Sequence, residues 1–311
     1  MLTKNWPRRT LLAGGAAIAL TRGATAQQVV WSTGTERPKT KAPPGATDCH
    51  HHIYDARFPV APGVAQKPGD ATVTEYRVLQ KRIGTTRNVI VLPSAYGVDN
   101  SCLVDALAQF GTRNTRGVAV VNTGVTDAEL HRLHKAGVRG IRFNLAPAGA
   151  TTLEMIEPLS QRVVKLGWHI QINMTSEMIL ANAAIWDRVP TQIVFDHLAH
   201  LREPDGVKDP AFAVVGDLLT KGKAWVKLSG AYADTKVGPP TYADSTEVAR
   251  AYVKLAPQRL VWGSDWPHPS EKVDAKPDDA LLFDLLSQWT PDEATRHRIL
   301  VNNPARLYGF G

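Results

Sequence analysis

Cysteine is scarce in this sequence, which has only two, Cys49 and Cys102, among 311 residues. A fold that depended on disulfide bonds would need more of them, so we expect two buried free thiols. Long apolar runs are also missing. Beyond residues 1–26, no stretch approaches the roughly 20 apolar residues of a membrane-spanning helix. The sequence therefore predicts no stable insertion into a membrane.

Basic residues are too few and too scattered to indicate a nucleic-acid-binding protein. The formal charge is +7, but residues 1–26 contain four basic residues and no acid, so the remainder carries only +3. No basic stripe alternates with aromatic residues, which argues against nucleic acid as a partner. A mildly basic surface does suit small anionic molecules. Because 43% of the residues are hydrophobic, the chain can form one large core.

The N terminus has the three parts of an export signal. Arg8 and Arg9 precede a short apolar run at 13–20, which is followed by small residues at 24–26. This order is typical of a secretory signal, and the paired arginines resemble a twin-arginine leader. We therefore predict a removable signal peptide at 1–26 and a periplasmic location. An uncleaved amphipathic N terminus is the alternative.

After a polar, proline-containing linker at 27–44, one domain is expected at 45–311. Here short apolar runs alternate with longer helical patterns. The runs are continuously apolar, as expected of strands that are buried on both faces. The predicted strands are 47–53, 88–92, 117–122, 140–144, 168–173, 192–196, 225–229 and 260–264. The predicted helices are 73–83, 102–110, 127–136, 153–166, 176–188, 211–221, 243–255 and 278–289.

Eight strands alternating with helices predict a single-domain (β/α)8 TIM barrel. Four predicted helices end just before Gly84, Gly111, Gly137 and Gly167. Glycine is favoured there because it easily adopts the left-handed conformation that ends many helices. A doubly wound open sheet is the alternative, but the sequence has neither the glycine-rich dinucleotide fingerprint nor a P-loop.

Three of the predicted strands end in residues that can carry out chemistry. The first ends in histidines 50–52, the sixth in Asp196-His197, and the eighth leads into Asp265 and His268. Active sites of such barrels lie at the C-terminal ends of the strands. Because side chains alternate along a strand, the first and third histidines share a face. Imidazoles and carboxylates either bind a divalent metal or exchange protons with water.

Each of these strand endings is, by itself, more often structural than functional. Their coincidence on three strands of one predicted barrel indicates a single shared site. On these grounds, we predict a site made of His50, His52, His197 and Asp265. The residue types alone leave open whether these side chains hold a metal or act directly on a substrate.

The same segments resemble the amidohydrolase 2 family of the amidohydrolase superfamily. The resemblance extends over about residues 45–308 and rests on 48–53, 195–197, 262–268 and 302–308. Within that family, segments 137–144 and 166–169 are most similar to the lactonases that open 2-pyrone-4,6-dicarboxylate. The resemblance therefore implies a barrel hydrolase that opens a small carboxylated lactone, so a small anionic ring is the expected partner.

The resemblance also implies roles for individual residues. It places His50, His52 and His197 around the reacting carbonyl and makes Asp265 the acid and base. Arg142 is expected to contact the substrate. Further substrate contacts are expected from Ser94, Tyr96, Asn173, His200, Lys227 and His268. For Lys227, a salt bridge inside the barrel is an equal alternative to a role beside the substrate.

Several positions depart from the lactonase pattern. Asn173 stands where those enzymes have a tyrosine, and His200 and Ala233 each stand where they have an arginine. A further arginine has no counterpart near 147–149. Arginine binds carboxylates in a bidentate way that asparagine or alanine cannot replace. We therefore expect retained chemistry on a different substrate. The alternatives are an isomerase of sugar-acid lactones, a decarboxylase and a non-catalytic periplasmic binding protein.

The resemblance allows for a metal without requiring one. Members of the superfamily generally hold one or two divalent ions, and two-metal sites use a lysine at the end of strand four. No lysine stands near 142–144, so we do not expect two ions. One Zn²⁺ or another divalent ion at His50, His52, His197 and Asp265 and a metal-free site remain the two alternatives. The sequence does not predict an oligomeric state.

Overall fold

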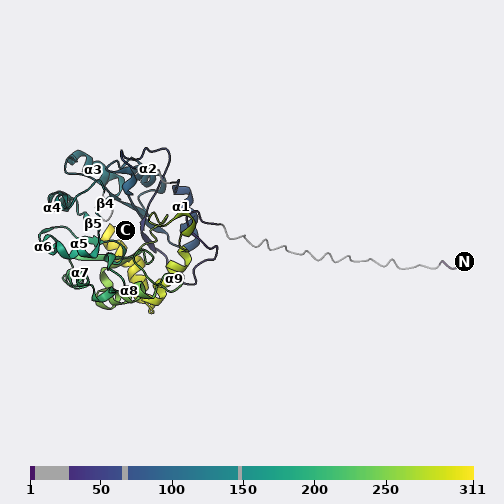
Figure 1. Cartoon of the computed structure of the whole chain (residues 1–311). Coiled ribbons are helices and arrows are strands. Elements are labelled where there is room, and N and C mark those ends of the chain that lie inside the picture. The colour runs from purple at the N-terminus through teal and green to yellow at the C-terminus, as the bar shows by residue number, and fades with distance from the viewer. Residues whose placement is uncertain (4–27, 65–68, 146–148) are drawn as a thin grey trace.

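The strands form a nearly closed barrel (Figure 1). The structure is a computed structural model that describes residues 1–3, 28–64, 69–145 and 149–311. Eight parallel strands are hydrogen-bonded in sequence order. They are β1 (Thr47–His51), β2 (Arg87–Val91), β3 (Thr115–Ala119), β4 (Val138–Asn144), β5 (His169–Asn173), β6 (Ile193–Phe195), β7 (Ala224–Leu228) and β8 (Leu260–Trp262). The predicted single-domain TIM barrel is confirmed.

Backbone contacts between the first strand and the segment after the last one close the ring. His52 donates its backbone N–H to the carbonyl of Trp266 (2.8 Å), and Asp265 donates to that of His50 (2.7 Å). Gly263 is required at this seam, because a Cβ atom there would lie 2.6 Å from the Cβ of His50. The closure therefore brings the predicted strand-one and strand-eight residues together.

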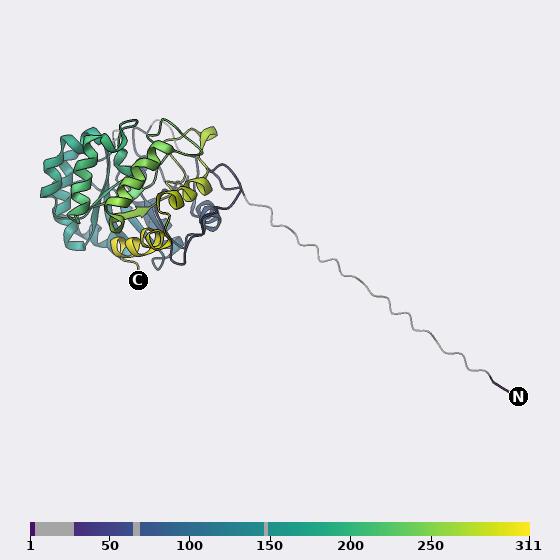
Figure 2. The same cartoon turned by 90° about the horizontal axis from the view of Figure 1, so that it is seen from below.

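Helices surround the barrel in the order that the sequence predicts (Figures 1 and 2). They are α1 (Val73–Ile83), α2 (Ser101–Phe110), α3 (Asp127–Ala136), α4 (Ile156–Val163), α5 (Ser176–Ala181), α6 (Ala183–Arg188), α7 (Pro210–Thr220), α8 (Ala243–Leu255), α9 (Asp279–Trp289), α10 (Glu293–His297) and α11 (Asn303–Tyr308). Gly84, Gly137 and Gly167 end helical segments in the left-handed conformation. Gly111 is different, because its ψ of 141° takes it out of that conformation.

Two predicted helices are divided. The segment 176–188 breaks at Asn182, which has a φ of −110° and bonds through its side-chain amide to the carbonyl of Met178. Asparagine favours such local bonds over a continuous helix. The segment 153–166 begins and ends with 3-10 turns, Leu153–Met155 and Val164–Leu166, on either side of α4.

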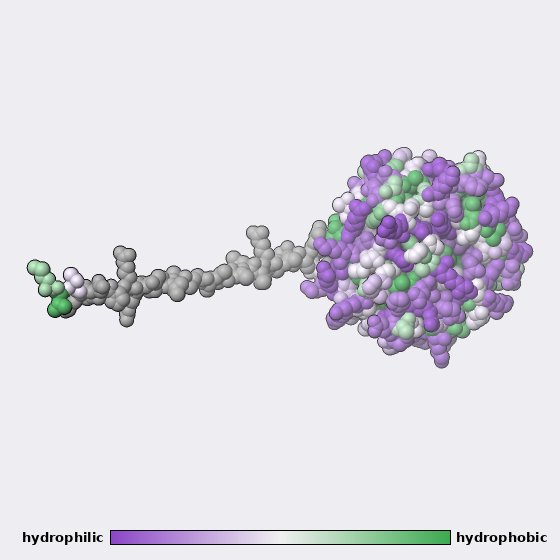
Figure 3. All heavy atoms as spheres, turned by 180° about the vertical axis from the view of Figure 1, so that it is seen from behind, coloured by the Kyte–Doolittle hydropathy of each residue, from purple (hydrophilic) through white to green (hydrophobic). Residues whose placement is uncertain are grey.

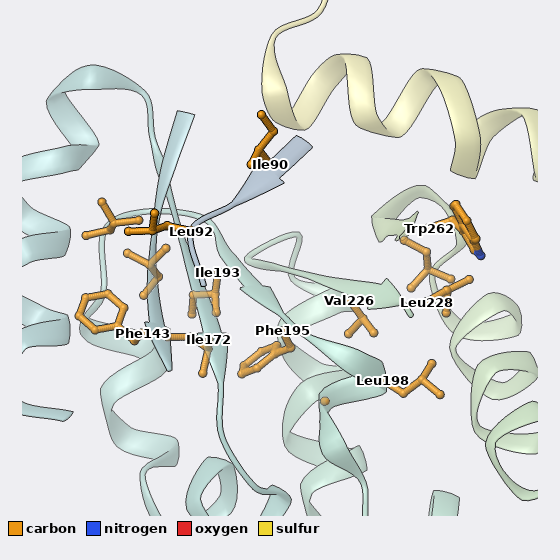
Figure 4. Close-up of a cluster of buried hydrophobic side chains, with 14 of the residues drawn as sticks. Ile90, Leu92, Phe143, Ile172, Ile193, Phe195, Leu198, Val226, Leu228 and Trp262 are labelled. Carbon is orange, nitrogen blue, oxygen red and sulfur yellow. The ribbon is translucent and has the colours of Figure 1, made fainter. Parts of the chain in front are cut away.

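Two apolar layers hold the barrel together. The outer layer lies between strands and helices and includes Ile90, Phe143 and Phe195 (Figure 4). The inner layer fills the barrel and includes Val89 and Trp225. Two residues near the C terminus, Tyr308 and Phe310, complete this inner layer. These two aromatic residues pack with Cys49 in the inner cluster, so α11 plugs the N-terminal end of the barrel.

Residues 28–44 lack helix and strand but are not a free linker. Val29 is buried, and the carbonyl of Val30 accepts the indole N–H of Trp266 at 2.7 Å. Arg82 of α1 bonds to Ser32 and to the carbonyl of Glu36. This N-terminal segment, residues 28–44, therefore packs against the barrel beside the closure between β1 and β8, and it is called the N-terminal strap below. The predicted signal peptide lies outside the described residues, apart from 1–3.

The surface is mainly hydrophilic, with small apolar patches, on the face shown in Figure 3. No helix among the described residues is both long and apolar enough to cross a membrane. Cys49 and Cys102 are both free and buried, as predicted.

Candidate active site

A cavity of about 490 Å³ opens at the C-terminal ends of the strands. Seven of the predicted site residues line it: His52, Ser94, Arg142, Asn173, His197, His200 and Asp265. The other four, His50, Tyr96, Lys227 and His268, are buried and are not among the residues that line it. The geometry therefore gathers most of the predicted residues around one cavity and places the rest behind its wall.

A bulge in β1 sets the direction of the histidines. Asp48 pairs with Asn88 but His51 pairs with Ile90, so β1 has one residue more than β2 over this stretch. A bulge of this kind interrupts strict alternation. Cys49 and His50 both reach the barrel interior, although they are consecutive. His51 instead stacks outside on Tyr76 of α1, with ring centroids 3.6 Å apart.

The carboxylate of Asp265 is the centre of the histidine cluster. Its Oδ1 lies 3.4 Å from Nε2 of His50, 3.4 Å from Nε2 of His52 and 3.8 Å from Nε2 of His197. Burial raises the pKa of Asp265, but the facing imidazoles outweigh it and hold that pKa well below its usual range. Asp265 is therefore a carboxylate at neutral pH. Its other oxygen, Oδ2, accepts the hydroxyl hydrogen of Tyr232 at 2.6 Å.

Hydrogen bonds orient the imidazoles. Nδ1 of His52 lies 2.8 Å from the carbonyl oxygen of Val91, which can only accept. Nδ1 therefore carries a hydrogen, and Nε2 faces Asp265. Burial lowers the pKa of His197 to about 4, and burial together with the nearby Lys227 ammonium holds the pKa of His50 well below its usual value. Both imidazoles are thus neutral at pH 7.

A buried network of charged and polar side chains lies beside the histidine cluster, inside the barrel. Oδ2 of Asp196 accepts from Nε of Arg142 (3.1 Å) and from Nε2 of Gln171 (3.0 Å). Lys227 donates to Oε1 of Gln171 (2.8 Å) and contacts Nδ1 of His50 (3.2 Å) and Oδ1 of Asp196 (3.5 Å). These contacts direct the ammonium of Lys227 toward buried groups inside the barrel. The geometry favours the interior salt bridge over direct substrate contact for this lysine.

Arg142 is left with binding capacity on the cavity side. Its Nε is fixed by Asp196, and among the described residues no acceptor is bonded to its two terminal nitrogens. It is the only arginine or lysine among the described residues that line the cavity, whereas Glu271 adds an acid to the wall. The cavity therefore offers one guanidinium to an anionic ligand.

Another part of the cavity wall is a chain of mostly uncharged hydrogen-bonding groups. Asn144 donates to Ser94 and accepts from Asn173 at 2.7 Å. Nε2 of His200 lies 2.7 Å from Oδ1 of Asn173, and its Nδ1 lies 2.9 Å from Asp234. Asn173 and His200, two of the departures from the lactonase pattern, are thus neighbours in one network. Ala233, the third departure, lines the same cavity.

The chain after β6 turns in the left-handed sense to place His197 and His200. Four consecutive residues, 197–200, have φ between 46° and 62°. Residues other than glycine avoid this conformation, and its presence in a site is a form of local strain. Gly230 makes room for the turn, because a Cβ atom there would lie 2.7 Å from Nδ1 of His197.

The sequence did not single out several residues of this site. Asn144 could have been found, because it follows Arg142 by two positions and so shares its face of β4. Tyr54 and Glu271 line the cavity from loops, and Tyr232 follows β7 in a loop. No local pattern marks these loop residues, since their positions depend on loop conformation.

Among the residues that the structure describes, two groups of side chains could hold a metal ion: His50-Asp196-His197 and His50-His52-Asp265. In the first group, Oδ2 of Asp196 accepts from Arg142, whereas Oδ1 has no hydrogen-bond partner among the described residues and lies 3.5 Å from the Lys227 ammonium, which disfavours a cation there. In the second, Nε2 of His50 and Oδ1 of Asp265 are buried atoms without a hydrogen-bond partner. The donor types and these orphaned atoms fit one divalent cation at the second group.

Known proteins with similar sequences act on lactones. Residues 47–310 match the family described as amidohydrolase. The chain is 35% identical to a 2-pyrone-4,6-dicarboxylate hydrolase of Comamonas testosteroni, over 89% of this chain and 94% of that protein. It is 36% identical to a 4-sulfomuconolactone hydrolase of Rhizobium radiobacter (86% and 91% covered). It is 31% identical to a D-galactarolactone isomerase of Agrobacterium fabrum (87% and 93% covered).

A solved structure has the same architecture. A protein of Agrobacterium tumefaciens, crystallised without ligand, superposes with a TM-score of 0.82 at 30% identity, over 90% of this chain and 99% of that one. The family match covers the whole barrel, and relatives above 30% identity match along nearly their entire length. The chain therefore belongs to the amidohydrolase family.

Proposed function

We propose that this protein hydrolyses a small lactone that carries one anionic group. The observation that carries the proposal is the Asp265 carboxylate, which is ionised and enclosed by three imidazoles. Arg142 lies beside it and supplies the one guanidinium that the described part of the chain places on the cavity wall. The relatives that hydrolyse lactones support the reaction class. The cavity of about 490 Å³ suits a substrate of one ring with short substituents.

Arg142 would bind the anionic group of the substrate and so fix the lactone carbonyl near the histidines. Asp265 takes a proton from water as the water oxygen attacks that carbonyl. Neutral His197, which lines the cavity, donates from Nε2 to the oxyanion of the tetrahedral intermediate. Protonated Asp265 then gives its proton to the departing ring oxygen. The products are an alcohol and a carboxylic acid, which releases one proton at neutral pH.

The charge of the cavity suggests that the preferred substrate is not a dicarboxylate. A second carboxylate on the ring would meet Asn173, His200 and Ala233 rather than arginines, with Glu271 nearby. A bidentate guanidinium contact to a carboxylate cannot be supplied by asparagine or alanine. We therefore expect 2-pyrone-4,6-dicarboxylate to be a poor substrate and a lactone with one carboxylate or sulfonate to be a better one.

Isomerisation is the second candidate, and the chain of Asn144, Asn173 and His200 favours it. Such groups can hydrogen-bond to the hydroxyls of a sugar-acid lactone, as in the substrate of the isomerase relative. A substrate hydroxyl would then replace water as the nucleophile. A pure binding protein fits less well, because it does not require a carboxylate among three imidazoles.

One divalent metal, such as Zn²⁺, fits the same donors. His50, His52 and Asp265 would hold it, with His197 nearby. When bound, such an ion supplies Lewis-acid polarisation of the lactone carbonyl. The role of Arg142 in binding the anion is the same with or without it.

A lactone screen tests this proposal. Purified protein is mixed with 2-pyrone-4,6-dicarboxylate, 4-sulfomuconolactone, D-galactarolactone and a set of monocarboxylated lactones, while acid release is titrated and products are followed by NMR. Acid release with ring opening supports hydrolysis. A rearranged ring without acid release supports isomerisation. Carbon dioxide release identifies a decarboxylase, and binding without conversion supports a binding protein. The last three outcomes each reject hydrolysis.

A further inference from the structure

One hydrogen bond of Asp265 has no role in the proposed hydrolysis. The hydroxyl of Tyr232, in the loop after β7, lies 2.6 Å from Oδ2 of Asp265. An ionised carboxylate can only accept, so Tyr232 is the donor. Tyr232 does not line the main cavity. It lines a neighbouring cavity of about 260 Å³, which shares Glu271 with the main one. It is therefore placed to act on Asp265 and not on the substrate.

The contact continues into a chain of hydrogen bonds. Nδ1 of His268 lies 3.0 Å from the hydroxyl oxygen of Tyr232. Because Tyr232 uses its only hydrogen on Asp265, His268 must donate through Nδ1. Its Nε2 lies 3.2 Å from Oδ2 of Asp279, and both residues are fully buried. The two ring nitrogens of His268 therefore contact two oxygen atoms, one of Tyr232 and one of Asp279.

The far end of this chain is firmly anchored. Asp279 is the first residue of α9, and its backbone N–H contacts the hydroxyl of Ser32 in the N-terminal strap at 3.2 Å. Lys276 donates to the backbone carbonyl of His268 at 2.6 Å. The rings of Tyr232 and His268 meet edge to face, with centroids 5.2 Å apart. The chain therefore has little freedom to shift relative to the barrel seam.

The two carboxylate oxygens of Asp265 therefore have different surroundings. Oδ2 is held by Tyr232, whereas Oδ1 has no hydrogen-bond donor among the described residues and faces the three imidazoles. A carboxylate held at one oxygen cannot rotate freely, so Oδ1 keeps its position among the imidazoles. We propose that Tyr232 is a positioning residue for Asp265 and that the His268–Asp279 pair acts through it. This inference rests on the proposed function.

Removal of one hydroxyl tests the role of Tyr232. Tyr232→Phe keeps the ring and removes the hydrogen bond to Asp265. For the lactone that the screen identifies, we expect kcat to fall about 10- to 100-fold, the rate equivalent of one hydrogen bond to a charged group. KM should stay within about twofold, because the substrate contacts are intact. A wild-type kcat, or a rise in KM that accounts for the whole loss, overturns the proposal.

A matched control is available in α8. The hydroxyl of Tyr252 is buried and has no partner among the described residues. Tyr252→Phe therefore removes a buried hydroxyl remote from the site, and both kcat and KM should be unchanged. Thermal unfolding of each variant shows whether it folds. If Y232F does not fold, Asp279→Asn is used instead. This change keeps a hydrogen-bonding side chain beside His268 but removes the carboxylate of Asp279. It should lower kcat without raising KM.

A double-mutant cycle tests whether the pair acts through Tyr232. D279N alone should lower kcat several-fold, but in the Y232F background it should cause no further loss. Additive losses overturn the proposed path. D265N is measured in the same assay to separate the two proposals. If D265N remains active, the proposed mechanism fails. If D265N is inactive while Y232F behaves as wild type, only the positioning role fails. A screen without any turnover overturns both.

Discussion

Replacement of Asp265 by asparagine should abolish turnover and leave the fold intact. Asparagine has nearly the same volume, and its side-chain oxygen can still accept the hydroxyl of Tyr232 (2.6 Å from Oδ2 of Asp265). What is lost is the basic oxygen that faces His50, His52 and His197 at 3.4 to 3.8 Å. Positioned acid–base groups contribute about 10²- to 10⁴-fold in rate. Because Asp265 would perform two proton transfers, we expect a loss near the upper end, about 5 kcal/mol.

The assay is steady-state hydrolysis of the best lactone from the screen, together with calorimetric measurement of binding. D265N should bind with near-wild-type affinity, because Arg142 is unchanged, while kcat falls by at least about 10³-fold. Unfolding of the variant would make Asp265 a structural residue. Retention of more than about a tenth of the activity would refute the reasoning and place the base on one of the imidazoles that face Oδ1 of Asp265.

Four other predictions follow from the buried charges and the N terminus. Lys227→Met should lower the free energy of unfolding in urea by about 3–5 kcal/mol, because Asp196 loses a buried partner; a change below about 1 kcal/mol contradicts the network. Burial lowers the pKa of His51 and His169 to about 3 and that of His197 to about 4. Since unfolded histidines titrate near 6.5, the unfolded state gains protons first, and stability should fall as pH drops from about 6.5 to 4. The raised pKa of Asp48, about 6 through burial, opposes this fall only in part; a flat urea-midpoint profile contradicts the assignment. Elemental analysis should find no more than one divalent ion per chain, and two would contradict the single-site geometry. Exported protein should begin near Gln27, and Arg8→Lys with Arg9→Lys should retain the precursor in the cytoplasm, so an exported chain that still starts at Met1 argues against the leader.

The barrel could be predicted from the sequence because its strands are short, continuously apolar and separated by well-marked helices. The helices 73–83, 127–136 and 243–255 begin and end where the pattern places them. The meeting of His52, His197 and Asp265 also follows from topology alone, because the C-terminal ends of parallel strands share one face.

The remaining features depend on tertiary contacts. The bulge in β1 admits both Cys49 and His50 to the interior, which simple alternation forbids. The left-handed turn at 197–200 is unfavourable locally and is maintained by its surroundings, including the space above Gly230. The bond from Tyr232 to Asp265 joins two loops whose conformations no local pattern describes. For Lys227, the sequence allowed either a contact with the substrate or a salt bridge inside the barrel. The contact with Asp196, which favours the salt bridge, exists only in the folded barrel.

The most direct test of the central claim is proton release during conversion of a monocarboxylated lactone by the purified protein. Hydrolysis predicts one proton released for each ring opened, with the linear hydroxy acid as the product. It also predicts that D265N releases none at a comparable rate. Conversion without proton release, or proton release that D265N matches, would contradict Asp265-assisted hydrolysis.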